Sequence, residues 1–183
     1  MARTQRLRLY LAGPAGAGKT RVAQGLASRY GFQRIGLGDL VREECLRLGF
    51  PLRRLYLQET GDRLRIAADD DAALVALALE RALPGARGVV VDGVRLVAEA
   101  EALREAGFFG VGLQAPDEVR GARLQARDGP DEVPRHRTER EAGRVPVDLR
   151  FGGVSEDPVV FAHGLGWLLH RCAQGQGRHA RIG

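Results

Sequence analysis

Lysine is almost missing from this chain, which has one lysine, Lys19, against 27 arginines. A skew of this size indicates a coding bias toward arginine and not selection for charge at each position. The net charge of +5 and the isoelectric point of about 10.0 favour anionic partners. Charge alone does not choose between nucleic acids, lipid headgroups and small phosphates, so the positions of the arginines must decide.

Cysteines, aromatic residues and long apolar runs are also scarce. Cys45 and Cys172 are far apart, and Cys45 lies in a helix-like stretch, which predicts free thiols in a reducing, cytoplasmic setting. No apolar run approaches the roughly 18 residues that span a bilayer, so we expect no membrane partner. With aromatics at 5% there are few rings to stack on bases, so we do not expect a nucleic-acid partner.

The 183 residues suffice for one domain that buries a core without disulfides or metals. Within it, strand-like and helix-like segments alternate, which predicts a three-layer α/β fold with a five-stranded parallel sheet. Asp39 is expected to cap the second helix. Strands are expected at residues 7–11, 32–38, 88–93, 108–115 and 147–153, and helices at 19–30, 39–48, 55–66, 70–83, 97–106, 117–127 and 158–173.

The segment Gly13–Thr20 reads GPAGAGKT, which is the phosphate-loop (Walker A) pattern between a strand and a helix. In such a loop the backbone N–H groups and the following helix N-terminus bind phosphate. Lys19 is expected to reach the β- and γ-phosphates, and Thr20 to offer its hydroxyl to Mg²⁺. The pattern predicts ATP and Mg²⁺ as cofactors, with the nucleotide held by Gly13, Ala15, Gly16, Ala17, Gly18, Lys19 and Thr20.

Three further residues follow the ends of other strands, where ligands bind in parallel sheets. Asp92 ends the expected third strand and is the natural second partner for the metal, directly or through water. Arg42 follows the second strand and Arg95 the third, so the two guanidinium groups could clamp a phosphate carried by an acceptor. Such a clamp favours a kinase over a nucleotide-hydrolysing switch.

Taken together, these motifs resemble the nucleoside-monophosphate kinase superfamily. The similarity is closest to adenylate-kinase-like and phage-type deoxynucleoside monophosphate kinases and to the dephospho-CoA-kinase-like branch. It rests on GPAGAGKT, GDLVREE, DGVR, APDEVRGARLQAR, LQETGDRLR and VVVDGVRLVAEAEAL, which span most of residues 7–130.

The resemblance implies a P-loop NTPase fold with a helical acceptor-binding region and a small lid. It implies that Arg42 and Arg95 hold the acceptor phosphate beside Asp39, and that Arg123 and Arg127 close over the transferring phosphoryl group. Arg137 or Arg140 is a weaker candidate for a further lid arginine, and Gln58 or Arg65 for a place near the acceptor base. The expected organisation is one kinase-like domain at 1–173, with the acceptor-binding insertion at about 38–83, the lid at about 123–146 and a disordered basic tail at 174–183.

The expected function is the Mg²⁺-dependent transfer of the ATP γ-phosphoryl group to a nucleoside or deoxynucleoside monophosphate, in cytoplasmic nucleotide metabolism, by a monomer or homodimer. One alternative is dephospho-CoA kinase, whose acceptor is a hydroxyl and for which Asp39 would be the base. Another is an ATP-binding regulatory or nucleic-acid-associated P-loop protein without kinase turnover.

Overall fold

A computed structural model of the chain describes residues 7–128, 137–152 and 164, without the side chains of residues 127, 128 and 139. Five parallel strands form one sheet in the order β2-β3-β1-β4-β5. The α/β fold with a five-stranded parallel sheet is therefore confirmed. The strands are β1 (Leu7–Ala12), β2 (Phe32–Gly36), β3 (Gly88–Val94), β4 (Phe109–Leu113) and β5 (Leu149–Phe151).

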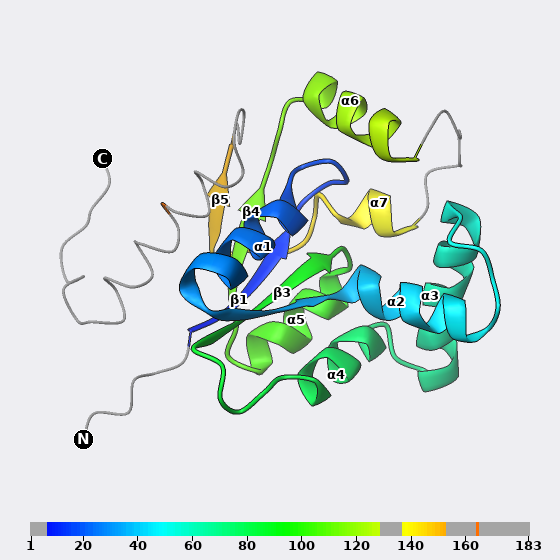
Figure 1. The fold of residues 1–183 in the computed structure, drawn as a ribbon, viewed down its shortest axis with the longest axis horizontal. Helices are drawn as coiled ribbons and strands as arrows, with labels where there is room; N and C mark the ends of the chain where they lie inside the picture. The colour runs from blue at the N-terminus through cyan, green and yellow to red at the C-terminus, as the bar shows by residue number, and fades with distance from the viewer. Residues whose placement is uncertain (1–6, 129–136, 153–163, 165–183) are drawn as a thin grey trace.

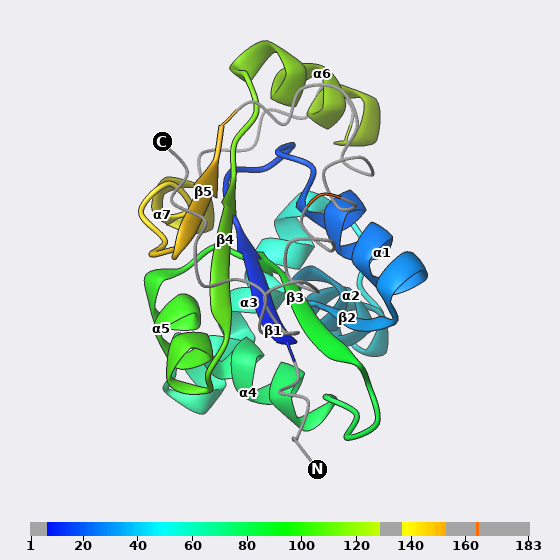
Figure 2. The same ribbon diagram turned by 90° about the vertical axis from the view of Figure 1, so that its left-hand side faces the viewer.

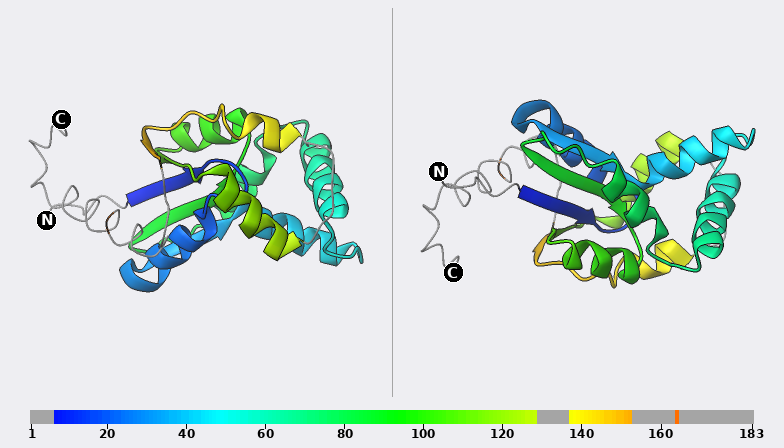
Figure 3. Two further views of the ribbon diagram at one scale, coloured as in Figure 1. Left: turned by 90° about the horizontal axis from the view of Figure 1, so that it is seen from above. Right: turned by 90° about the horizontal axis from the view of Figure 1, so that it is seen from below.

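Helices cover both faces of the sheet, with α1 on one side and α5 and α7 on the other (Figure 3). Helix α6, which follows β4, lies above the carboxyl ends of the strands, and α2 and α3 pack together beyond the β2 edge (Figure 1). The helices are α1 (Lys19–Tyr30), α2 (Leu37–Arg47), α3 (Arg54–Ala68), α4 (Ala73–Glu80), α5 (Val97–Glu105), α6 (Asp117–Asp128) and α7 (Arg137–Glu141).

Two apolar clusters, one on each face of the sheet, form the core. The strand β3 explains why, since its run of valines is buried on both faces, as expected for a central parallel strand. Val90 packs with Leu9 and with Val22 of α1 in one cluster. Val91 belongs to the other cluster, with Tyr10 and residues of α2, α4 and α5. Burying both faces fixes the register of the strands and thereby the positions of the loops that follow them.

The second strand ends earlier than expected, and Asp39 is not the helix cap. Gly36 takes that position with an extended backbone, and α2 begins at Leu37. The prediction of Asp39 as N-cap is wrong because its carboxylate forms ion pairs with arginines instead. Helix α4 is also shorter than expected, since Asp70 accepts a hydrogen bond from the N–H of Ala72 just before the helix.

The segment expected as a lid is helical at both of its described ends. Residue 123 lies inside α6. Helix α7 follows the undescribed stretch 129–136 and lies on the same side of the sheet as α5 (Figure 2), and Ala142 and Val145, just after it, are buried. The helix expected at 158–173 lies outside the described residues except for residue 164, which is helical, and the tail 174–183 lies wholly outside them. In the described part, no helix is both long and apolar enough to cross a bilayer.

Candidate functional site

The phosphate loop connects β1 to α1 at the carboxyl edge of the sheet. Gly16 has a φ of 79°, and a Cβ atom there would lie 2.8 Å from the backbone oxygen of Arg120 in α6. Only glycine combines this dihedral with this close approach at low cost. Gly18 precedes α1, whose first turn contains no acidic residue, so the positive end of the helix remains suited to a phosphate.

Lys19 lies folded over its own loop. Its Nζ atom donates to the carbonyl oxygens of Gly13 at 2.6 Å and of Pro14 at 2.7 Å, and the residue is only 7% exposed. These contacts hold the ammonium group against the backbone of the loop that the sequence predicts to bind phosphate. A compact charge fits this position, whereas the planar fork of arginine does not, which explains why the chain keeps lysine here.

Thr20 and Asp92 lie near each other beside the loop, and the Thr20 hydroxyl interacts with the Asp92 carboxylate. Burial raises the pKa of Asp92, and both Arg34 and the Thr20 hydroxyl oppose that rise. The Oδ1 atom of Asp92 is buried and accepts no hydrogen bond. A hydroxyl and a carboxylate oxygen with spare capacity are ligands that Mg²⁺ takes, so the residues present fit this metal.

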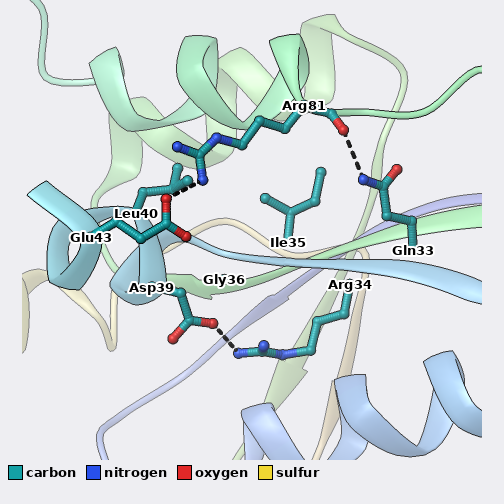
Figure 4. Close-up of a pocket in the computed structure, with 8 residues that line it drawn as sticks. All are labelled: Gln33, Arg34, Ile35, Gly36, Asp39, Leu40, Glu43 and Arg81. Carbon is teal, nitrogen blue, oxygen red and sulfur yellow. Dashed lines mark hydrogen bonds and ion pairs between the residues drawn. The ribbon is translucent and has the colours of Figure 1, made fainter.

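Asp39 lies in the first turn of α2 between two arginines. Its Oδ1 atom accepts a hydrogen bond from Nη1 of Arg42 at 2.9 Å, and its Oδ2 atom lies 2.7 Å from Nη2 of Arg34. Figure 4 shows the second of these contacts at a cavity of about 190 Å³ along β2. At the rim of that cavity Arg81 pairs with Glu43 at 2.6 Å. Both carboxylate oxygens of Asp39 are thus engaged by guanidinium groups.

The end of β3 lies against the start of α2. A Cβ atom on Gly93 would lie 3.5 Å from the backbone nitrogen of Gly38, and a Cβ atom on Gly38 would lie 3.3 Å from Nη1 of Arg42. Gly38 therefore lies between the Arg42 guanidinium group and the end of β3, which Arg95, a half-buried residue, directly follows. Arg42 belongs to the helix that follows β2 and Arg95 to the turn that follows β3, and these two strands are neighbours in the sheet.

Glu99 fixes the turn after β3 through hydrogen bonds to its backbone. Its Oε2 atom accepts hydrogen bonds from the N–H groups of Arg95 and Leu96, at 2.9 and 3.1 Å, as a capping box at the start of α5. Its Oε1 atom accepts a hydrogen bond from Nη2 of Arg65 at 2.8 Å, and both side chains are buried. Arg65 also lies 3.6 Å from Asp62. The side chain of Arg65 is therefore held by one ion pair within α3 and by one that joins α3 to α5.

Arginines of α6 contact the phosphate loop. Nη1 of Arg123 donates to the carbonyl oxygen of Gly16 at 3.1 Å, and Nη1 of Arg120 donates to that of Ala15 at 3.2 Å. Arg120 also pairs with Asp117 at 2.6 Å. Of the two arginines predicted to close over the phosphoryl group, Arg123 thus lies at the loop. Arg127 belongs to α6, but its side chain lies outside the described part.

The weaker lid candidates lie on α7. Arg137 binds Asp71 through both of its terminal nitrogens, one of them at 2.8 Å from Oδ1, and binds Glu141 through Nε at 2.7 Å. This pairing connects α7 with the turn between α3 and α4. Arg140 is exposed. Their assignment to a lid over phosphate remains a prediction.

Three residues at the site escaped the sequence interpretation, namely Arg34, Glu99 and Arg120. The alternation of β2 could have indicated that Arg34 lies on a covered face of the sheet, because residues two apart in a strand share a face and Phe32 packs on α1. Arg120 lies one turn before Arg123, so both project from the same side of α6. Glu99 gave a weaker signal, since a glutamate at the third position of a helix is also typical of exposed capping boxes.

Comparison with known proteins places the chain in a family. A family model described as an AAA domain (AAA_18) matches residues 9–144. A UPF0200 protein from Aeropyrum pernix is 38% identical over 129 residues, which cover 69% of this chain and 68% of that protein. The chain therefore belongs to the AAA_18 and UPF0200 families. The matched residues of this UPF0200 chain include the phosphate loop, Asp39, Asp92 and α6.

Solved structures similar to this UPF0200 chain agree on the fold. Shikimate kinase from Acinetobacter baumannii, in complex with shikimate, aligns with a TM-score of 0.59 at 13% identity over 96% of this chain and 97% of that one. A gluconokinase from Sinorhizobium meliloti 1021 aligns with a TM-score of 0.54 at 19% identity over 95% and 97%. The UPF0200 chain thus has the fold of P-loop kinases, and at these identities the likeness extends to the fold alone.

Proposed function

We propose that this protein transfers the γ-phosphoryl group of ATP, with Mg²⁺, to the phosphate of a small acceptor, a nucleoside or deoxynucleoside monophosphate. The observation that carries the proposal is the meeting of two sets of side chains at one sheet edge. Lys19, Thr20 and Asp92 form the set suited to Mg²⁺·ATP. Arg42 is connected to Asp92 through Asp39 and Arg34, and Arg95 follows directly on β3, whose end packs on the start of α2.

Mg²⁺, when bound with the nucleotide, would neutralise charge on the β- and γ-phosphates. Thr20 and Asp92 would hold it, and the phosphates themselves would supply further oxygen ligands. In the described part of the chain, no three His, Cys, Asp or Glu side chains are grouped so that they could hold a metal ion. Lys19 would leave the carbonyl oxygens of Gly13 and Pro14 for the phosphates, and the α1 N-terminus would add its dipole.

The arrangement around Asp39 favours a phosphate acceptor over a hydroxyl acceptor. A hydroxyl must lose its proton during transfer, which calls for a carboxylate oxygen within hydrogen-bond reach. Both oxygens of Asp39 already pair with guanidinium groups, those of Arg34 and Arg42, so a hydroxyl would have to share an oxygen with one of these arginines. A phosphate oxygen is already anionic and needs positioning and charge neutralisation only. Dephospho-CoA is therefore the second candidate acceptor.

A nucleotide as the acceptor follows from the resemblance of GDLVREE and DGVR to the acceptor-binding motifs of nucleoside-monophosphate kinases. Arg42 and Arg95 would bind the acceptor phosphate, and the helices α2 and α3 would flank the base. Arg123 and Arg127 would balance the charge of the transferring group from α6. The buried ion pair of Arg65 with Glu99 favours a structural role for Arg65 in this region over contact with the base.

An acceptor panel tests the proposal. ADP release from Mg²⁺·ATP is measured by a coupled assay with each of the common ribo- and deoxyribonucleoside monophosphates, dephospho-CoA, shikimate and gluconate. We expect acceptor-stimulated turnover with at least one monophosphate and none with the Lys19→Met variant. Stimulation by dephospho-CoA alone would favour the second candidate. ATP binding without stimulation by any acceptor would contradict kinase activity and favour a regulatory P-loop protein.

A further inference from the structure

Arg34 lies on β2 and reaches the carboxyl edge of the sheet with its guanidinium group. Its Nη2 atom lies 2.7 Å from Oδ2 of Asp39, and 3.1 and 3.3 Å from the two carboxylate oxygens of Asp92 (Figure 4 shows the contact with Asp39). One nitrogen therefore bridges a carboxylate on α2 and a carboxylate on β3. We name Arg34, Asp39 and Asp92 the arginine bridge.

Gly36 leaves the space in which the arginine bridge fits. A Cβ atom at this position would lie 2.3 Å from Oδ2 of Asp39, 2.7 Å from Nη2 of Arg34 and 2.9 Å from Oδ1 of Asp92. Gly36 is also the register partner of Asp92 in the neighbouring strand. All three side chains thus converge over one glycine, and any larger residue would push them apart.

The contact between Arg34 and Asp92 is not the bidentate pair that usually joins arginine to a carboxylate. Nε of Arg34 and Oδ1 of Asp92 are both buried and take part in no hydrogen bond. Asp92 has only 3% of its side chain exposed, and such a buried carboxylate needs a nearby positive charge. Arg34 supplies that charge but leaves part of the bonding capacity of both groups unused, so a better cation could replace it.

We propose that Arg34 is the exchangeable counter-ion of Asp92. When Mg²⁺·nucleotide binds at Thr20 and Asp92, the guanidinium group of Arg34 moves away from Asp92 and the metal takes its place. Asp39 retains the guanidinium group through the shorter, 2.7 Å contact, so Arg34 stays at the site beside Asp39. No bond is made or broken in this step, since one cation replaces another. The inference rests on the proposed binding of Mg²⁺·nucleotide, but it does not depend on which acceptor is used.

The test measures metal affinity and not turnover. Mn²⁺ is titrated into protein saturated with ADP, and the bound metal is measured by electron paramagnetic resonance for wild type, Arg34→Met, Arg34→Lys and Arg81→Met. Since the metal no longer competes with a guanidinium group, we expect Arg34→Met to bind Mn²⁺ about tenfold more tightly. Arg81→Met is the matched control, because it removes an equal charge at the same cavity from an arginine that pairs with Glu43 and not with Asp92. Its Mn²⁺ affinity should differ from that of wild type by less than about twofold.

Thermal unfolding provides the second readout. Without metal, Arg34→Met leaves Asp92 uncompensated, so its midpoint should fall below that of wild type, and Mn²⁺·ADP should raise it by a larger step than in wild type. If Arg34→Met does not fold, Arg34→Lys serves instead. Lysine keeps the positive charge but reaches the two carboxylates less well, so its Mn²⁺ affinity should lie between those of wild type and Arg34→Met. Equal or weaker Mn²⁺ binding in a folded Arg34 variant would overturn the exchange alone. A wild-type protein that binds no Mn²⁺·ADP would overturn both the exchange and the proposed function.

Discussion

Glu99 and Arg65 form a buried ion pair, 2.8 Å long, that joins α5 to α3. The second oxygen of Glu99 accepts hydrogen bonds from the backbone of Arg95 and Leu96. One carboxylate therefore connects α3 with the turn that carries Arg95. This relationship explains why a glutamate and an arginine, charged residues that are rarely buried, occupy interior positions here.

Removing Glu99 should destabilise the fold strongly. Glu99→Ala leaves the Arg65 guanidinium buried without its partner and the turn after β3 without its cap, so we expect the free energy of unfolding to fall by about 3–5 kcal/mol. Urea unfolding followed by circular dichroism measures this loss. Glu101→Ala, at an exposed position of the same helix, should change the free energy by less than about 0.5 kcal/mol. Similar losses in both variants would contradict a specific role of the pair.

Lys19 should not be replaceable by arginine. Lys19→Met removes the charge that would stabilise the transferring phosphoryl group, and we expect kcat to fall by about 10²- to 10³-fold. Lys19→Arg keeps the charge, but its planar group does not fit the concavity at Gly13 and Pro14, so we expect a loss of similar order. Steady-state kinetics with the best acceptor provide the measurement. Activity close to wild type in Lys19→Arg would refute the argument from shape.

Arg42 should act on the acceptor and not on ATP. Since a charge-assisted contact to phosphate contributes about 1.5–3 kcal/mol, Arg42→Ala should raise the acceptor KM by roughly 10- to 100-fold and leave ATP binding nearly unchanged. The matched control is Arg47→Ala on the same helix, where Arg47 is exposed and pairs with Glu44. ATP affinity is measured by calorimetry. An equal loss of ATP and acceptor binding in Arg42→Ala would remove its assigned role.

The pair of Arg137 and Asp71 should contribute little to stability. Both side chains are close to half exposed, so solvent and salt screen their attraction. A double-mutant cycle with Arg137→Met and Asp71→Asn should give a coupling energy below about 1 kcal/mol at low salt, and a smaller one at 0.5 M salt. A large coupling that persists in salt would show that this contact between α7 and the α3–α4 turn is stronger than its exposure implies.

The sequence predicted those features that depend on local pattern. The phosphate loop has a fixed spacing, and the valines of β3 mark a strand buried on both faces, so both features and the parallel sheet could be read from residues near one another. Asp39 was misread because its helix cap and its ion pairs use the same carboxylate, and only the tertiary structure brings Arg34 to it. Residues such as Asp92 and Arg42 were predicted to lie at one edge, as they do, because parallel strands end there.

Contacts between distant segments were beyond the reach of the sequence. Arg34 was read as part of a strand, and nothing near it in the chain indicated that Asp92 would approach its guanidinium group, since that contact depends on the pairing of β2 with β3. The docking of α6 on Gly16 also depends on the path of the chain after β4. Such contacts decide the electrostatics of the site, which explains why residue types could be predicted there better than their partners.

The central claim is that the phosphoryl group passes to a phosphate oxygen. The most direct measurement is ³¹P NMR of the protein with Mg²⁺·ATP and the acceptor that stimulates ADP release most. The account predicts that the acceptor phosphate resonance is replaced by the coupled pair of a new phosphoanhydride, and that Lys19→Met abolishes the change. A new phosphomonoester resonance on an acceptor hydroxyl would contradict it. So would release of the γ-phosphoryl group as inorganic phosphate alone, with the acceptor unchanged.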